Sequence, residues 1–146
     1  MPIKLFTIGF TKKNAAKFFG LLRDAGIRRV IDTRLNRTSQ LAGFAKEQDL
    51  PFLLREICHA DYETQPLLAP TEDILSAYKK KRINWNSYEE RFNALIRDRQ
   101  IESKLQPPQL DNTCLLCSED KPHQCHRRLV AEYLREKWGD VQIEHL

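Results

Sequence analysis

Two segments near the end of the chain combine residue types suited to cysteine or acid–base chemistry. Cys117 is followed by Glu119, and eight residues after Cys117 the run Cys125-His126-Arg127 occurs. A helix is expected to begin near Cys125, and a thiol at a helix N-terminus beside cationic side chains has a lowered pKa. Cys125 is therefore a candidate nucleophile, and Glu119 and His126 are candidates for acid–base catalysis.

Each of these residues also has a structural interpretation, and the sequence leaves both open. Cys125 can be a small residue at a helix start, Glu119 can be solvated on a short loop, and His126 can bond a strand carbonyl. Cys114 and Cys117 are predicted to be buried and inert in a strand. The separation of Cys117 and Cys125 matches no sequence spacing that is typical of metal-binding or redox-active cysteines.

Three polar segments supply hydrogen-bond donors suited to an anion such as phosphate. Each follows a predicted strand, and together they comprise residues 9–11, 32–39 and 118–127. The carboxyl ends of parallel strands meet at one edge of a sheet, and the third segment also leads into a helix N-terminus, so we expect an anion there. The expected ligand-binding residues are Thr11, Asp32, Arg34, Arg37, Ser39, Cys117 and Arg127. The structural alternative is that Asp32 pairs with Arg34 or Arg127 only to hold a loop in place.

Cysteine and histidine close together in sequence also raise the question of a zinc site. Cys114 and Cys117 are three residues apart in a predicted strand, so their side chains point to opposite faces and do not easily share a metal ion. The sequence therefore assigns no metal ligand, and it leaves any cofactor unknown.

The elements that must position these residues alternate between strands and helices. Apolar runs predict strands over residues 3–8, 29–32, 57–62, 113–117 and, at a sheet edge, 141–145. Periodicity and caps predict helices ending before Gly26, over 50–57, after a Thr71 cap, from a Ser87–Glu90 capping box to about Lys104, and from near Cys125 to Gly139. This order predicts one α/β domain over residues 1–146, with a mostly parallel sheet and helices on both faces, in a Rossmann-like or rhodanese-like architecture.

Composition narrows the class of protein. Of 146 residues, 41% are hydrophobic and 30% are charged, which excludes a disordered chain, and no apolar run approaches the length of a membrane span. Four cysteines without an export signal predict reduced thiols in the cytoplasm. The formal charge of +4 is compatible with a phosphate-bearing small molecule or a nucleic acid as partner, and no membrane partner is expected.

Three motifs carry a family resemblance over nearly the whole chain. They are Thr7-Ile-Gly-Phe-Thr11, Val30-Ile-Asp-Thr-Arg34, and Leu115-Leu-Cys-Ser-Glu119 followed by Cys125-His-Arg127. The sequence resembles the bacterial and archaeal family called domain of unknown function 488. The resemblance implies an α/β domain and a shared site at Asp32, Arg34, Cys117, Glu119, Cys125, His126 and Arg127. Phe10 stands where many members have histidine, so a histidine-based mechanism here would depend on His126. A looser similarity to rhodanese-like domains is a fold-level analogy.

The leading function hypothesis is an anion pocket at the carboxyl ends of the strands, for a phosphate- or sulfur-oxyanion-bearing ligand such as a nucleotide. Whether the protein is an enzyme stays open. The first alternative is a nucleic-acid-binding or accessory module without catalysis, which would use Lys79 to Arg82. The second alternative is a zinc-stabilised structural protein.

Overall fold

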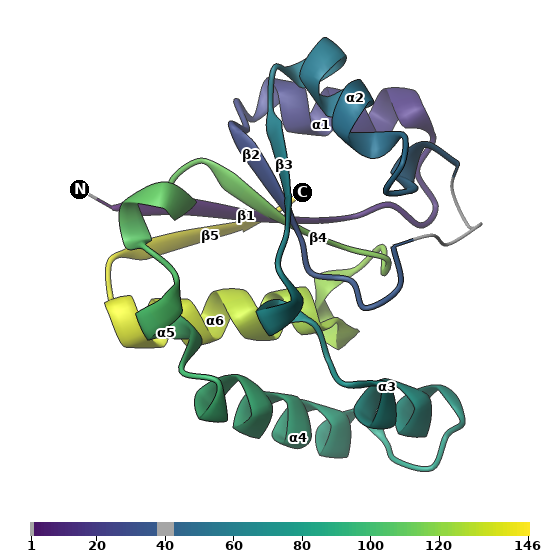
Figure 1. The fold of residues 1–146 in the computed structure, drawn as a ribbon, viewed down its shortest axis with the longest axis vertical. Coiled ribbons are helices and arrows are strands. Elements are labelled where there is room, and N and C mark those ends of the chain that lie inside the picture. The colour runs from purple at the N-terminus through teal and green to yellow at the C-terminus, as the bar shows by residue number, and fades with distance from the viewer. Residues whose placement is uncertain (1, 38–42) are drawn as a thin grey trace.

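A five-stranded, all-parallel sheet forms the centre of the protein, of which the computed structural model describes residues 2–37 and 43–146 (Figure 1). Its strands run in the order β3-β2-β4-β1-β5. They are β1 (Ile3–Gly9), β2 (Arg29–Asp32), β3 (Asp61–Thr64), β4 (Thr113–Cys117) and β5 (Val141–His145). Each neighbouring pair is parallel. The predicted α/β fold is confirmed, and β5 lies at an edge as predicted.

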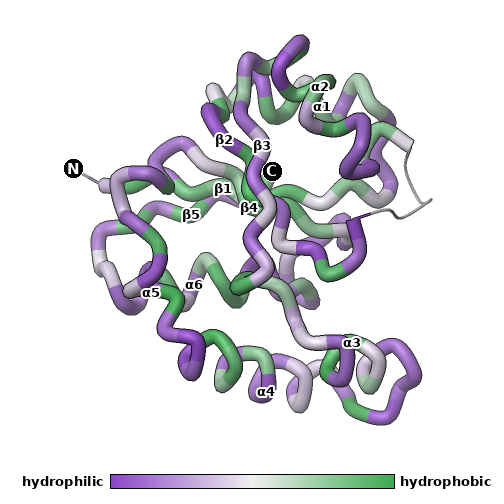
Figure 2. The backbone as a smooth tube through the Cα atoms, in the orientation of Figure 1, coloured by the Kyte–Doolittle hydropathy of each residue, from purple (hydrophilic) through white to green (hydrophobic). Residues whose placement is uncertain are grey.

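Helices cover both faces of this sheet, as the sequence predicts. One face packs against α1 (Ala15–Asp24) and α2 (Leu50–Leu53). The other packs against α4 (Trp85–Asp98), α5 (Ile101–Lys104) and α6 (His126–Trp138), and α3 (Glu72–Lys79) lies beside α4 (Figure 1). Successive strand residues point to opposite faces of the sheet, and both faces are covered, so the middle strands are almost wholly hydrophobic (Figure 2). In contrast, hydrophobic and hydrophilic residues alternate along α4, which has one covered face (Figure 2).

Helix starts follow local capping chemistry, with one prediction wrong. Thr71 caps α3 as predicted, accepting a hydrogen bond from the Ile74 amide. The predicted capping box at Ser87 does not form, because Asn84 takes that role and accepts from the Ser87 amide at 2.9 Å. The helix therefore begins three residues earlier than expected. It also ends at Asp98, and Gln100 in a left-handed conformation separates it from α5.

The third strand begins later than predicted. The helix that starts at Leu50 continues through a π-helical turn, Leu54–Cys58, and so occupies residues that the sequence assigns partly to a strand. His59 ends that turn in a left-handed conformation (φ 54°), and β3 pairs with β2 only from Asp61. The polar, exposed character of β3 fits its place at the other edge of the sheet.

Chain connections leave a crevice between the carboxyl ends of β2 and β4. These strands are neighbours, yet the chain leaves β2 towards the α1–α2 face and leaves β4 towards the α6 face. Loops that diverge in this way create the place where open α/β sheets bind ligands. None of the helices in the described part of the chain combines the length and apolar character that crossing a bilayer requires.

Gly9 at the end of β1 is required by a close approach of two backbone segments. A Cβ at this position would lie 1.5 Å from the Glu119 carbonyl oxygen and 2.8 Å from NH1 of Arg127. The loop after β4 therefore rests directly on β1, and its position depends on the missing side chain.

Gly9→Ala is expected to lower the free energy of unfolding by about 1–3 kcal/mol, because the added methyl group displaces the backbone of Glu119. Gly20→Ala in α1 is the control: no atom lies within 4 Å of its added Cβ, and it should raise stability by about 0.5–1 kcal/mol. Urea denaturation of both variants measures the difference. An unchanged unfolding midpoint for Gly9→Ala would show that the loop adapts freely.

Candidate functional site

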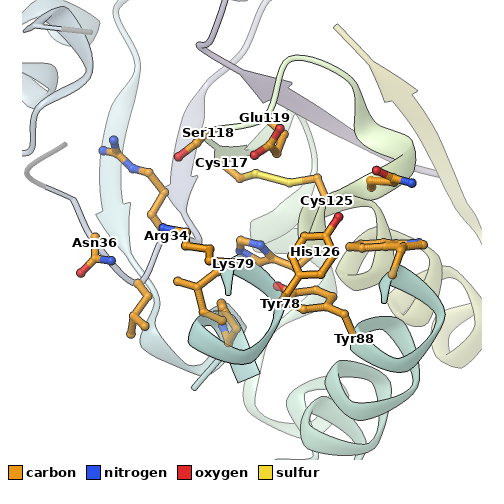
Figure 3. Close-up of a pocket in the computed structure, with 15 residues that line it drawn as sticks. Arg34, Asn36, Tyr78, Lys79, Tyr88, Cys117, Ser118, Glu119, Cys125 and His126 are labelled. Carbon is orange, nitrogen blue, oxygen red and sulfur yellow. A yellow bond between two sulfur atoms is a disulfide. The ribbon is translucent and has the colours of Figure 1, made fainter. Parts of the chain in front are cut away.

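A cavity of about 390 Å³ occupies the crevice between β2 and β4 (Figure 3). Its walls come from the loop after β2, the loop after β4, the start of α6, and the helices α3 and α4. The lining residues are Arg34, Leu35, Asn36, Pro70, Leu75, Tyr78, Lys79, Trp85, Tyr88, Cys117, Ser118, Glu119, Gln124, Cys125 and His126. Five residues of the predicted site therefore meet in one cavity, and all of them lie at strand ends or at the start of α6.

A disulfide joins Cys117 to Cys125 at the wall of this cavity (Figure 3). The prediction that all four thiols are reduced is wrong for this pair, which the structure joins in a disulfide. The chain between them folds back, so the residue at the end of β4 meets the residue that precedes α6. Cys114 is fully buried and free, as predicted, and burial raises its pKa.

Arg127 holds this folded-back loop in place from beneath the cavity. The side chain is fully buried, and its guanidinium donates to the carbonyl oxygens of Glu119 and Asp120. Its Nε donates to the hydroxyl of Thr7 at 3.2 Å, and NH1 lies 3.7 Å from Sγ of Cys117. Burial lowers the pKa of Arg127 to about 10, so the group stays cationic at neutral pH. The guanidinium therefore donates mainly to the protein backbone, and the side chain lies beneath the loop after β4.

Asp32 and Arg34 form a buried ion pair, which realises the structural alternative raised by the sequence. Nε and NH2 of Arg34 donate to the two carboxylate oxygens at 2.9 and 2.7 Å, and the hydroxyl of Tyr62 donates at 2.5 Å. NH2 also donates to the Ala45 carbonyl. The guanidinium lies away from the disulfide, so only the rest of Arg34 faces the cavity (Figure 3).

His126 is buried below the disulfide and is held by the loop after β2. Its Nε2 donates to the Thr33 carbonyl at 2.7 Å and lies 3.0 Å from the Thr33 hydroxyl. The hydroxyl itself donates to the carbonyl of Leu116. Burial lowers the pKa of His126 to about 4, so the ring is neutral at neutral pH. Because Nε2 carries the proton, Nδ1 is the ring nitrogen with a free lone pair.

The far wall of the cavity is aromatic, which the sequence did not assign to the site. Trp85 and Tyr88 stack with ring centroids 5.0 Å apart, and Tyr78 contacts both. Tyr88 is buried, and burial raises its pKa. Trp85 and Tyr88 lie three residues apart at the start of α4. That spacing indicates a shared helix face, but it does not show that this face borders a cavity.

Two further residues of the predicted site, Thr11 and Arg37, lie outside the cavity lining. Thr11 donates its hydroxyl to the Ser118 carbonyl and so supports the loop after β4. Arg37 pairs with Glu47 at 2.5 Å on the surface, and this pairing raises the pKa of Arg37. Ser39 lies outside the described residues.

A family model described as Domain of unknown function DUF488 matches residues 14–134. The chain belongs to this family. The match covers most of the sheet and extends through most of α6, so the DUF488 region contains both cysteines of the disulfide. No curated protein and no solved structure matches the chain. The geometry of the cavity therefore has to carry any statement about what this DUF488 protein does.

Asp32→Asn is expected to lower the free energy of unfolding by about 3–5 kcal/mol, because it leaves the buried Arg34 guanidinium without its counter-ion. The control is Glu47→Gln, which breaks a half-exposed ion pair and should cost about 1 kcal/mol or less. Chemical denaturation compares the two. Equal losses of stability in the two variants would contradict the larger contribution that we assign to the buried Asp32–Arg34 pair.

Burial of neutral His126 predicts a loss of stability in acid. The histidine pKa is about 4 in the folded protein and about 6.5 in an unfolded chain, so the unfolded state takes up the proton first as the pH falls. Stability is fully present above pH ~6.5 and should decrease by about 3 kcal/mol as the pH falls to ~4. Denaturation across this range measures the slope.

The variant His126→Gln isolates this contribution, because its stability should change less over the same pH range than that of the wild type. His123→Gln is the matched control: it replaces an exposed histidine three residues away and should keep the wild-type slope. Equal slopes for wild type and His126→Gln would assign the acid sensitivity to other groups.

Proposed function

We propose that Cys117 and Cys125 are a redox-active pair that exchanges electrons with a small disulfide or thiol bound in the cavity, with Cys125 as the attacking thiol. The observation that carries this proposal is the position of the disulfide. It forms part of the wall of a cavity at the carboxyl ends of the strands, and it ends at the first turn of a helix. A disulfide that served only to fasten the loop would not need to face a cavity.

Electrostatics at both sulfur atoms favour the thiolate form when the pair is reduced. Cys125 is the N-cap residue of α6, where free backbone amides and the helix dipole stabilise an anion. Cys117 lies beside the cationic guanidinium of Arg127, with Sγ 3.7 Å from NH1. Thiolates are the reactive form in disulfide exchange, so both partners are prepared for it.

The exchange proceeds in two balanced steps. The Cys125 thiolate attacks one sulfur of a bound disulfide, forming a mixed disulfide and releasing the other half as a thiolate, which takes up a proton. The Cys117 thiolate then attacks Sγ of Cys125, which forms the Cys117–Cys125 bond and releases the second half of the substrate. Two electrons pass from the protein to the substrate. A dithiol reductant restores the reduced pair by the reverse sequence.

Access to the sulfur atoms restricts the substrate to small molecules. Cys117 is 2% exposed and Cys125 is 3% exposed, and both are reached through the cavity. A disulfide on the surface of a folded protein would have to enter this cavity, whose lining includes the bulky rings of Tyr78 and Trp85. A low-molecular-weight disulfide fits the volume of about 390 Å³.

The sequence predicts an anionic ligand, and this proposal keeps the negative charge as an acidic group on the small disulfide. Arg34 and Arg127 direct their guanidinium groups to protein partners, whereas Lys79 lines the cavity with an exposed side chain and the start of α6 offers free amides. A small disulfide with an acidic group is therefore the preferred substrate. Glu119, also in the lining, opposes an acidic group on its own side and so orients the substrate.

A trapping experiment tests the exchange. Reduced Cys117→Ser treated with a small acidic disulfide, such as dithiodiglycolate, should gain the mass of one substrate half on Cys125, because no thiol remains to resolve the mixed disulfide. Wild-type protein should instead form the internal disulfide and release two thiols per chain. Intact-mass and peptide mass spectrometry measure both outcomes.

Matched variants identify the residues that contribute. Cys58→Ser removes a half-buried thiol outside the cavity and should behave as wild type. Lys79→Gln should slow reaction with the acidic disulfide relative to neutral hydroxyethyl disulfide, and Lys80→Gln, one residue outside the cavity, should not. If the wild-type disulfide resists a strong dithiol in the folded protein, or Cys117→Ser traps no adduct, the pair is structural and the proposal fails.

A further inference from the structure

We infer that the reduced form of this site binds one zinc-like metal ion through Cys117, Cys125 and His126, so that the disulfide and the metal are alternative occupants of the same place. Among the described residues, these three form the one group of histidine, cysteine or acidic side chains that is close enough to hold an ion. The two sulfur atoms and one ring nitrogen all lie within 4.8 Å of one another. Two thiolates with one imidazole form a donor set typical of zinc.

The backbone already has the separation that two metal-binding cysteines need. The Cα atoms of Cys117 and Cys125 are 7.5 Å apart. Disulfides usually join Cα atoms about 4.4–6.8 Å apart. Two thiolates that each bind zinc at about 2.3 Å lie nearly 4 Å from one another. The longer Cα separation therefore gives the reduced sulfur atoms room to move apart by side-chain rotation alone.

The surroundings of His126 match those of a metal-bound histidine. Its Nε2 donates to the Thr33 carbonyl at 2.7 Å, which fixes the tautomer and leaves Nδ1 as the donor atom. Nδ1 makes no hydrogen bond to any described residue. Metal-binding histidines almost always donate their other ring nitrogen to a carbonyl or carboxylate in this way. Phe92, packed edge-on at 5.4 Å, fixes the plane of the ring further.

The fourth position of a tetrahedral ion would open into the cavity. Three protein ligands with an open position are typical of a site that exchanges a water or a small ligand. Glu119 is the acidic residue that lines the same cavity, and it is therefore the candidate to hydrogen-bond or replace that water. The strand argument against zinc concerned Cys114 and Cys117, which indeed serve opposite sides of the sheet, and it does not apply to Cys117 with Cys125. The separate expectation that the spacing of Cys117 and Cys125 fits no metal site is the one that this inference reverses.

The conversion between the disulfide and the metal-bound form is balanced in electrons and protons. A dithiol reductant gives two electrons to the disulfide and becomes a disulfide itself, leaving two thiols on the protein. A divalent ion then binds the two sulfur atoms and displaces their two protons to solvent. Oxidation by a small disulfide reverses the change and releases the ion.

Cobalt titration of the full-length protein tests the inference. The anaerobically reduced wild type should bind one Co²⁺ and gain thiolate-to-cobalt charge-transfer absorption in the near ultraviolet, and one Zn²⁺ should displace it. The oxidised protein should show neither signal. Cys117→Ser, Cys125→Ser and His126→Asn should each weaken Co²⁺ binding by about 100-fold or more.

Two controls make a negative result meaningful. Cys58→Ser should bind Co²⁺ as the wild type does, because its thiol lies outside the cavity. Glu119→Gln should retain the thiolate bands and change the weaker d–d bands, which report the open position. A folded, fully reduced wild type without thiolate-to-cobalt absorption would overturn the inference, as would equal loss in Cys58→Ser. Disulfide exchange measured with a chelator present is independent of this result, so failure of metal binding leaves the redox proposal intact.

Discussion

The buried guanidinium of Arg127 is the interaction on which the site depends. A charge without solvent is costly unless each donor finds an acceptor, and here the acceptors are backbone carbonyls of the loop after β4 and the hydroxyl of Thr7 on β1. Satisfying this charge forces the loop to fold back over the sheet, and Gly9 provides the space for it to do so. That folding brings Cys125 to Cys117. The meeting of the two cysteines thus follows from how the donors of one buried arginine are satisfied.

The second buried arginine explains why the cavity is less basic than the sequence suggests. Nε and NH2 of Arg34 donate to Asp32, and NH2 also donates to the Ala45 carbonyl. NH1 is buried without a partner among the described residues, and the Phe10 ring centroid lies 5.3 Å from the central carbon of the guanidinium. Phe10 thus provides an aromatic face for the cation. With both arginines used internally, the cavity presents sulfur, aromatic rings, one carboxylate and Lys79. Those groups are the reason that we propose a small disulfide, and not a bare phosphate, as the ligand.

Most of the fold can be read from the sequence, because buried parallel strands are continuous apolar runs and this signal is local. The strands that contain Cys117 and Val30 were predicted in this way. The start of β3 was not, since the helical turn before it ends only at His59, through a left-handed conformation that no pattern marks. The site is harder, because polar residues at strand ends predict where a cavity lies but not which donors remain available. The assignment of Arg127 to carbonyl oxygens, and the meeting of two cysteines across a loop, depend on three-dimensional closure that residue spacing does not encode.

The chemistry of the reduced pair gives a physical reason for its two proposed states. Reduction places two sulfur atoms that favour the thiolate form within a few ångströms of one another, and like charges at that distance destabilise each other. Arg127 offsets part of this repulsion at Cys117, and the start of α6 offsets part of it at Cys125. Two routes remove the rest: formation of the disulfide, which takes away both charges with two electrons, or binding of a divalent cation, which compensates both without electron transfer. Neutral His126, which has a ring nitrogen within 4.8 Å of both sulfur atoms, contributes only to the second route. Its burial below the disulfide therefore fits the proposed metal-bound state, whereas a simple structural cross-link would not require it.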